Sequence, residues 1–235
     1  MPDFRDRNVI VTGGTGALGA AVVAELLAGG AICHVPYYID AEEANFPHRS
    51  HPRVKLISGA NLGSQTVVTR LYEAVPKLWA SIHLAGGFAA SPIAATDEAE
   101  LMGMIRTNLV TCFLCCAAAV TAIRRAGNGG GRIINIAARP ALEPRLGAGA
   151  IAYAASKAGV AALTQGLAAE VLQENILVNA IAPSTLDTEA NRKSMPKADH
   201  SLWPKPAEVA AIICNLAAPS NRVTSGAIIP VYGRA

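Results

Sequence analysis

The sequence predicts an α/β fold, with one doubly wound parallel sheet of about seven strands and helices on both faces. Short aliphatic runs alternate with alanine- and leucine-rich stretches of helical period, and the runs lie at residues 8–12, 32–36, 54–58, 80–84, 131–136, 177–181 and 227–231. Strands separated by helices pair in parallel through right-handed crossovers. Only 16% of the residues are charged, which suits a sheet covered on both sides.

Length and composition indicate one domain. The 235 residues show no repeat or linker, so we expect a single domain over 1–235. The net charge of +3 comes without a basic run interleaved with aromatics, which argues against nucleic-acid binding. The N-terminus lacks an apolar secretion core, and the longest apolar stretch, about residues 112–123, is too short to span a bilayer. We therefore expect a cytoplasmic protein with no membrane partner.

The first predicted strand leads into a glycine-rich loop. Residues 13–19 read Gly-Gly-Thr-Gly-Ala-Leu-Gly, and a helical pattern continues to about residue 28. Strand, glycines and helix in this order form the Rossmann-type context in which the backbone approaches a pyrophosphate and a helix N-terminus stabilises it. The alternative is an ordinary tight turn. On the first interpretation, the cofactor contacts Gly13, Thr15, Gly16, Ala17, Leu18 and Gly19.

Cysteine usage indicates a reducing compartment. The five cysteines are odd in number and poorly spaced for pairing. Cys112, Cys115 and Cys116 share one face of a predicted helix, but no histidine or further cysteine completes a metal site beside them in the sequence. We therefore expect these thiols to lie in the core or at a subunit contact, and we expect no bound metal.

A tyrosine and a lysine stand four residues apart on another predicted helix. Tyr153 and Lys157 lie within the apolar stretch 150–172 and therefore share a helical face. A free tyrosine has a pKa of about 10, and a nearby ammonium favours the phenolate. The pair is thus a candidate for general acid–base chemistry, although pairs at this spacing also arise by chance.

Together these motifs resemble the short-chain dehydrogenase/reductase family over nearly the whole chain. Thr12-Gly13 with Gly16 and Gly19 is similar to its glycine motif, except that Ala17 replaces the second motif glycine. The resemblance implies an active-site asparagine at Asn108, within a helix over about 97–125, beside the Tyr153 and Lys157 pair. It implies further cofactor contacts at Asn61, Leu62, Ala85, Gly86, Gly87, Lys157, Pro183, Leu186 and Thr188.

One member of the family's catalytic set is missing. The family places a serine at the end of the fifth strand, and here Ala137 and Ala138 occupy that segment. Arg139 is a candidate replacement donor, the alternative being an arginine that faces solvent. The segment 185–199 and the run Ala-Gly-Gly-Phe at 85–88 also resemble quinonoid dihydropteridine reductases, which lack the serine too. That resemblance implies an electron-poor, pterin-like substrate or a related pocket.

Cofactor choice depends on the end of the second strand. An acidic residue there binds the ribose hydroxyls of NAD, and an arginine favours NADP. Tyr37 occupies the expected position and Asp40 follows three residues later, without an arginine clamp, so we favour NAD. Pro36 should end the strand, and His34 is either a ligand contact or, more simply, a core histidine.

These observations predict an NAD(P)-dependent oxidoreductase that transfers a hydride between nicotinamide and a carbonyl or quinonoid small molecule. The alternative is a nucleotide-binding sensor or scaffold that has lost turnover with the serine. The segment 184–206 is rich in proline and polar residues and predicts a substrate lid. The apolar helical stretches at 109–123 and 151–172 exceed what one sheet face covers, which predicts a homo-oligomer, a tetramer or a dimer.

Overall fold

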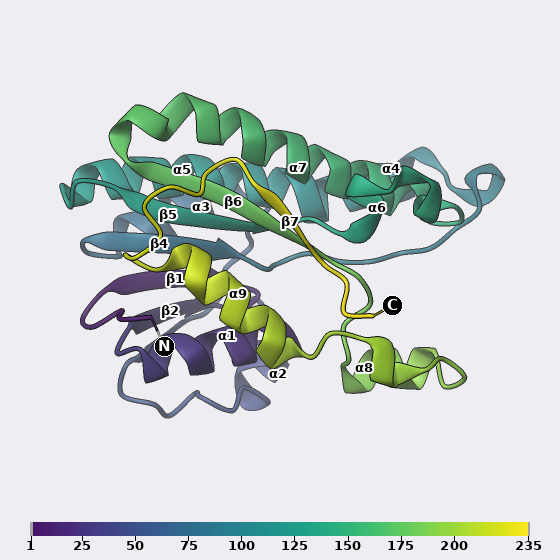
Figure 1. Ribbon diagram of the computed structural model, residues 1–235, viewed down its shortest axis with the longest axis horizontal. Helices are drawn as coiled ribbons and strands as arrows, with labels where there is room; N and C mark the ends of the chain where they lie inside the picture. The colour runs from purple at the N-terminus through teal and green to yellow at the C-terminus, as the bar shows by residue number, and fades with distance from the viewer. Residues whose placement is uncertain (1, 235) are drawn as a thin grey trace.

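A computed structural model describes residues 2–234 and confirms the predicted fold class. Seven parallel strands form one sheet in the order β3-β2-β1-β4-β5-β6-β7 (Figure 1). The strands are β1 (Asn8–Thr12), β2 (Ile32–Pro36), β3 (Val54–Ile57), β4 (Leu78–His83), β5 (Gly131–Ile136), β6 (Ile176–Pro183) and β7 (Ile228–Val231). The chain builds outward from β1 to β3 and then returns to β4. The strand order therefore reverses between β1 and β4, where sheets of this kind bind ligands.

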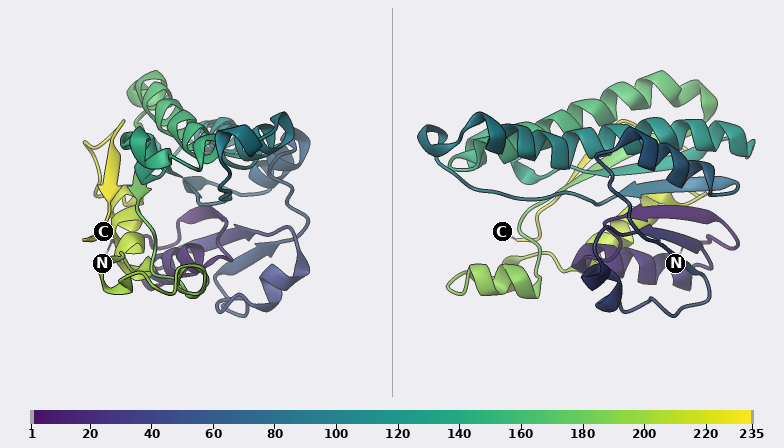
Figure 2. Two further views of the ribbon diagram at one scale, coloured as in Figure 1. Left: turned by 90° about the vertical axis from the view of Figure 1, so that its right-hand side faces the viewer. Right: turned by 180° about the vertical axis from the view of Figure 1, so that it is seen from behind.

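Helices cover both faces of the sheet (Figures 1 and 2). One layer contains α1 (Ala17–Ala28) and α9 (Pro206–Ala217), and the other contains α3 (Gln65–Glu73), α5 (Thr111–Ala126) and α7 (Ile151–Val171). The remaining helices are short, namely α2 (Asp40–Ala44), α4 (Glu98–Met104), α6 (Arg139–Leu142) and α8 (Glu189–Ser194). Single 3-10 turns lie at Ile93–Ala95, Pro144–Gly147, Leu172–Glu174 and His200–Leu202.

Alternation along the strands divides the core between these two layers. Val9 and Val11 of β1 pack with α1 and α9, whereas Ile10 packs with α3, α5 and α7. In β5, Ile134 packs with α1 and α9, and Ile133 packs with α3, α5 and α7. Successive side chains of a strand point to opposite faces, so a central strand buried on both sides reads as a continuous apolar run. That is why these strands were visible in the sequence.

The helix expected over 97–125 is not uniform. It consists of α4, a π-helical segment at Ile105–Val110 and α5, and Asn108 lies in the π-helical segment. Such segments widen a helix locally and occur often at functional sites.

The combined helical run Glu98–Ala126 is long and apolar enough to cross a membrane by length and composition alone. The expectation drawn from 112–123 missed this, because it considered only the second half of the run. Cys116, Ala119 and Ile123 on its inner face pack into the core with α3 and α7. Those contacts are the packing of a core helix.

Two segments project beyond the carboxyl ends of the strands. One is the connection after β4 that leads to α4, and the other is the predicted lid at 184–206, which carries α8 (Figures 1 and 2). Within the lid, Arg192 donates to the Asp187 carboxylate across 2.5 and 2.8 Å. The main-chain N–H of Asp187 donates to the carbonyl oxygen of Pro204 at 2.9 Å, which joins the two ends of the segment. The lid is therefore an ordered unit, and its movement stays a prediction.

Candidate active site

Gly13 and Gly19 give the glycine loop its shape. Gly13 adopts a φ of +66°, and a Cβ there would lie 2.6 Å from the nitrogen of Ala85. A Cβ on Gly19 would lie 2.2 Å from the carbonyl oxygen of Gly13. Both glycines are thus required by backbone packing within the loop and against the β4 end. This packing accounts for the tight turn of the loop, and contact of Gly13 and Gly19 with a pyrophosphate stays a prediction.

Gly16 is a glycine of the loop at which a side chain would find free space. A Cβ there would meet only the carbonyl oxygen of Gly13, at 3.5 Å. Gly16 is also the N-cap of α1, which begins at Ala17 with no side-chain cap and no acidic residue in its first turn. An uncapped helix N-terminus beside an open glycine fits the phosphates of a dinucleotide. Thr15, Ala17 and Leu18 lie at the same helix start, as predicted.

Gly86 lies between the two predicted polar residues of the site. A Cβ on Gly86 would lie 2.6 Å from Oδ1 of Asn108 and 3.4 Å from Nζ of Lys157. Asn108 is buried, accepts from Gly87 N at 2.9 Å, and donates to Gly87 O at 3.1 Å and to Ser156 Oγ at 2.9 Å. The Asn108 side chain therefore clamps the backbone that follows β4. Its amide is thus occupied by the Gly87 backbone and by Ser156.

Ser156 was missed in the sequence analysis. Its hydroxyl donates to the Tyr153 carbonyl at 2.7 Å and accepts from Asn108. It joins α7 to the π-helical segment, and its place between Tyr153 and Lys157 was the only signal.

Burial sets the proton affinities of Tyr153 and Lys157. It raises the pKa of Tyr153 to about 12. It lowers the pKa of Lys157 to about 8, with a smaller opposing effect of Cys112. The Lys157 ammonium donates to the carbonyl oxygen of Ile136 at 3.0 Å. The expectation that Lys157 lowers the pKa of Tyr153 is therefore wrong for the protein alone, because desolvation dominates and opposes both charged forms.

The aromatic ring of Tyr153 meets Phe88 on the connection after β4. The two rings pack edge to face with centroids 4.9 Å apart, and Phe88 is 67% exposed. The Phe88 ring thus covers part of Tyr153 and leaves an exposed apolar surface beside it.

Buried alanines, Ala137 and Ala138, occupy the end of β5 where the serine is missing. Ala138 is buried and is the N-cap of α6. Arg139 donates from Nε to both carboxylate oxygens of Glu143 at 3.2 Å and stacks 4.5 Å from the centre of the Tyr232 ring. Arg139 is thus held by these two side chains at the edge of the site, and is not a solvent-facing arginine.

The predicted adenosine end contains several carboxylates. Tyr37 donates its hydroxyl to Glu43 at 2.5 Å, and Glu42 accepts from the main-chain N–H groups of Tyr38 and Ile39. Asn61 and Leu62 follow β3 nearby, where Ala60 N donates to Tyr37 O. Pro36 ends β2, as predicted. His34 bonds Asn8 at 2.9 Å, and burial lowers its pKa to about 4, so it is a core histidine.

The remaining predicted cofactor-binding residues lie at and after the end of β6. Pro183 closes the buried strand β6, and Leu186 packs against the α1 and α9 layer. Thr188 accepts from Asn191 N as the N-cap of α8, which leaves its hydroxyl hydrogen available to donate.

Comparisons with known proteins identify the family of this chain. The sequence profile described as short chain dehydrogenase matches residues 7–199. The 3-oxoacyl-(acyl-carrier-protein) reductase MabA of Mycobacterium tuberculosis is 28% identical over 99% of this chain and 94% of its own. A rhamnolipids biosynthesis 3-oxoacyl-(acyl-carrier-protein) reductase of Pseudomonas aeruginosa is 28% identical over 97% of this chain and 95% of its own.

Solved structures support the same fold. The crystal structure of gox2181 superposes with a TM-score of 0.90 at 23% identity, covering 98% of this chain and 96% of that one. ElxO with NADP bound gives a TM-score of 0.87 at 22% identity, covering 97% of this chain and 98% of that one. The profile match and the full-length relatives lead to one conclusion: the chain belongs to the short-chain dehydrogenase family and is an NAD(P)-dependent oxidoreductase.

Proposed function

We propose that this protein reduces the carbonyl group of a small molecule with NADH, and that a 3-oxoacyl thioester is the substrate class to test first. The observation that carries the proposal is that Lys157 and Asn108 meet around Gly86 at the carboxyl ends of the strands, with the ring of Tyr153 packed against Phe88 of the same connection after β4. The names of the full-length relatives favour a carbonyl over the pterin-like ring that the segment 185–199 suggested.

A bound nicotinamide would supply the hydride, and the chain's own residues would handle the proton. Tyr153 gives its phenolic proton to the substrate oxygen, and its raised pKa keeps that proton in place at neutral pH. Lys157, with a pKa of about 8, is mainly an ammonium at pH 7 and stabilises the tyrosinate left behind. Asn108 fixes the Gly87 backbone, which belongs to the proposed site, through two hydrogen bonds.

The missing serine restricts the substrate. Loss of one donor to a developing oxyanion costs about 3 kcal/mol of transition-state stabilisation. A carbonyl that is activated by its neighbours tolerates that loss better than a simple ketone. The exposed Phe88 ring beside Tyr153 suits a substrate with an apolar portion.

NAD is favoured over NADP by the charges around Tyr37. Asp40, Glu42 and Glu43 all lie in the first turn of α2. The 2′-phosphate of NADP would add about two negative charges next to these carboxylates. One unit charge pair at 4 Å repels by about 1 kcal/mol in water and by more where water is excluded. Glu43→Gln should therefore raise the preference for NADPH over NADH about fivefold, measured as the ratio of kcat/KM values.

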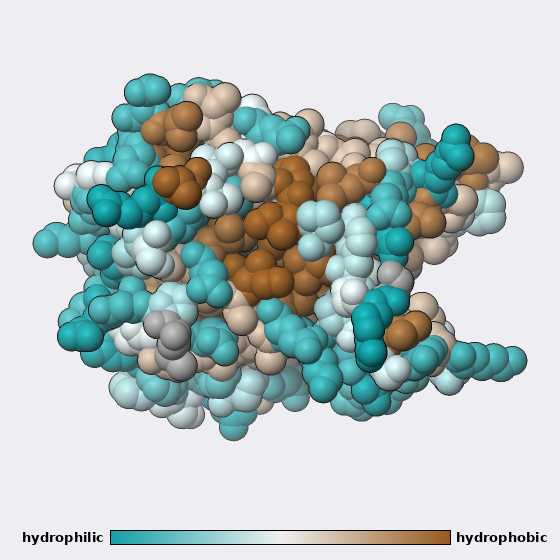
Figure 3. All heavy atoms as spheres, viewed as in Figure 1, coloured by the Kyte–Doolittle hydropathy of each residue, from teal (hydrophilic) through white to brown (hydrophobic). Residues whose placement is uncertain are grey.

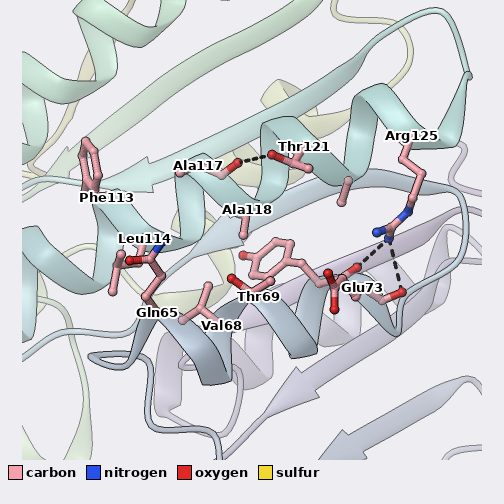
Figure 4. A pocket seen from close by; sticks show the side chains of 12 residues that line it. Gln65, Val68, Thr69, Glu73, Phe113, Leu114, Ala117, Ala118, Thr121 and Arg125 are labelled. Carbon is pink, nitrogen blue, oxygen red and sulfur yellow. Dashed lines mark hydrogen bonds between the residues drawn. The ribbon is translucent and has the colours of Figure 1, made fainter.

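We also propose a homotetramer. Figure 4 shows a groove between α3 and α5 lined by Val68, Leu114 and Ala118, with Phe113 at its edge; Phe113 is 55% exposed. Figure 3 shows a second apolar area over the β6–β7 side, where the edge strand β7 carries partly exposed Ile228 and Ile229. The groove also carries polar residues, among them Thr69 and Arg125, whereas the second area is apolar. Two separate surfaces of this kind suit a tetramer with two kinds of interface.

The decisive assay measures oxidation of NADH with a 3-oxoacyl thioester, a simple ketone and a quinonoid dihydropterin. Turnover of the thioester above the other two supports the proposal, and turnover of the dihydropterin alone contradicts it. Saturable NADH binding without turnover of any substrate favours the sensor.

We place the activity in the cytoplasm, because all five cysteines are free and buried, as a reducing compartment allows.

A further inference from the structure

Three potential metal ligands meet in the core behind the proposed active site. They are His83 at the end of β4 and Cys112 and Cys116 on α5, and one ligand atom from each lies within 4.8 Å of the others. All three are buried, with exposures of 3%, 6% and 2%. The spacing of four residues places both thiols on one face of α5, directly over the end of β4. The sequence analysis found no histidine for these cysteines, because His83 precedes them by a whole helical connection.

The side-chain amide oxygen of Asn135 is a fourth potential ligand atom beside these three residues. Nδ1 of His83 lies 2.8 Å from Oδ1 of Asn135 and 3.6 Å from Sγ of Cys116. Cys116 Sγ in turn lies 3.5 Å from the same Asn135 oxygen. The Asn135 Nδ2 group donates to Thr164 at 2.9 Å, which turns Oδ1 toward the thiol and the imidazole. Hydrogens on sulfur and nitrogen therefore converge on one oxygen, and a cation replacing them would meet the same atoms.

The outer contacts also suit a metal-binding histidine. The other ring nitrogen, Nε2, lies 2.8 Å from Ser81 Oγ and 3.1 Å from Tyr72 OH. A ligating histidine characteristically donates its second N–H to such a partner, which fixes its orientation.

We propose that His83, Cys112 and Cys116 bind one Zn²⁺ ion, with Asn135 Oδ1 as the fourth ligand. Tetrahedral zinc with bonds of about 2.3 Å to sulfur and about 2.05 Å to nitrogen separates those two atoms by about 3.6 Å, which matches the distance from His83 to Cys116. With a zinc–oxygen bond of about 2.1 Å, the nitrogen and the oxygen would lie about 3.4 Å apart. His83 Nδ1 and Asn135 Oδ1, which lie 2.8 Å apart in the metal-free protein, must therefore separate by about 0.6 Å when the ion binds. Two thiolates neutralise Zn²⁺, so the loaded site carries no net charge in the core. Binding releases the two thiol protons to solvent and involves no oxidation or reduction.

The expected role of the ion is structural. It would join β4, β5 and α5 one helical turn beyond Asn108, on which the Gly87 backbone depends. None of the four ligands belongs to the proposed catalytic or cofactor-binding set, although Cys112 acts on the pKa of Lys157. The test below therefore measures metal binding and not turnover, so that its failure is distinct from a failure of the proposed reaction.

The test uses the full chain, purified with a reductant and stripped with a chelator. Zn²⁺ or Co²⁺ is then added either to the folded protein or during refolding from denaturant, because the site is buried. We expect one equivalent of Zn²⁺ after buffer exchange, and Co²⁺ should give a thiolate charge-transfer band with tetrahedral d–d bands. At free Zn²⁺ about a hundred times Kd, the Tm should rise by about 5–10 °C.

Two variants and a matched control locate the metal. Cys112→Ser and Cys116→Ser should each weaken metal binding at least tenfold, whereas Cys115→Ser, a buried thiol on the same helix outside the cluster, should bind as the wild type does. Far-UV circular dichroism verifies the fold of each variant. Should a cysteine variant not fold, the Co²⁺ spectrum of the wild type still reports sulfur ligation. The proposal fails if the wild type binds no metal under either loading, if Co²⁺ shows no charge-transfer band, or if Cys115→Ser loses binding as Cys112→Ser does.

Discussion

Adding one methyl group at Gly16 or at Gly19 should separate cofactor binding from loop architecture. In Gly19→Ala, the new Cβ would lie 2.2 Å from Gly13 O and 2.5 Å from Gly14 Cα. Both neighbours are backbone atoms, so the loop itself must move by about 1 Å to restore ordinary contact. Overpacking of this kind costs about 1–3 kcal/mol. The Tm should fall by about 2–12 °C for a chain of this size.

Gly16→Ala should behave differently. The φ of Gly16 is −75°, which alanine adopts without strain, and the nearest atom to its Cβ is 3.5 Å away. Alanine is a poorer N-cap than glycine, so the free energy of unfolding should fall by only about 0.5 kcal/mol. The methyl group nevertheless projects over the N-terminus of α1, where the pyrophosphate is expected. NADH affinity should therefore weaken at least tenfold, equivalent to about 1.4 kcal/mol.

The assay pairs NADH titration by fluorescence with urea unfolding. Gly166→Ala is the matched control, since a Cβ at this helical glycine meets nothing within 4 Å and lies outside the proposed site. It should be stabilised by about 0.5–1 kcal/mol with unchanged NADH affinity. Wild-type affinity in Gly16→Ala would remove the open side of the loop from the cofactor site. Wild-type stability in Gly19→Ala would refute the packing argument.

Four further predictions concern the proposed site and the surface. Tyr153→Phe should keep the fold and NADH affinity, while turnover of a carbonyl substrate falls by roughly 10²–10⁴-fold. Full activity of this variant on every substrate found would show that another group is the acid. Ala138→Ser should speed carbonyl reduction if its hydroxyl reaches the oxyanion. Lys157 has a pKa of about 8 in the folded protein and about 10.4 when unfolded, so between these values the unfolded chain binds more protons and stability rises with pH. Buried Tyr153 and the buried thiols oppose this rise, so the wild type must be compared with Lys157→Met. The difference in the free energy of unfolding should grow by about 2 kcal/mol from pH 8 to 10, and a constant difference would contradict the assignment. Phe113→Glu should reduce the tetramer to a smaller species in light scattering, and a wild-type monomer at micromolar concentration would contradict the proposed assembly.

The sequence by itself determined the sheet and the positions of the main motifs. Residues such as Val9, Ile10 and Val11 are apolar in succession because a central parallel strand is buried on both faces, and that pattern needs no long-range information. The glycine loop and the spacing of Tyr153 and Lys157 are also local features, because each lies within a short stretch of the chain. Helix period fixes which side chains share a face, whatever the face then meets.

Only the tertiary structure decided what those faces meet. Gly13 is confined by Ala85, which is distant in sequence, and Gly19 by the carbonyl of Gly13, so the reason for each glycine was not visible in the motif. The pKa values of Tyr153 and Lys157 depend on desolvation by the packed domain, which reverses the shift expected for Tyr153 from the pair alone. His83 joins Cys112 and Cys116 only because β4 ends beneath α5. Strand and helix periodicities are local properties of the chain, whereas burial and ligand clusters depend on contacts between segments far apart in it.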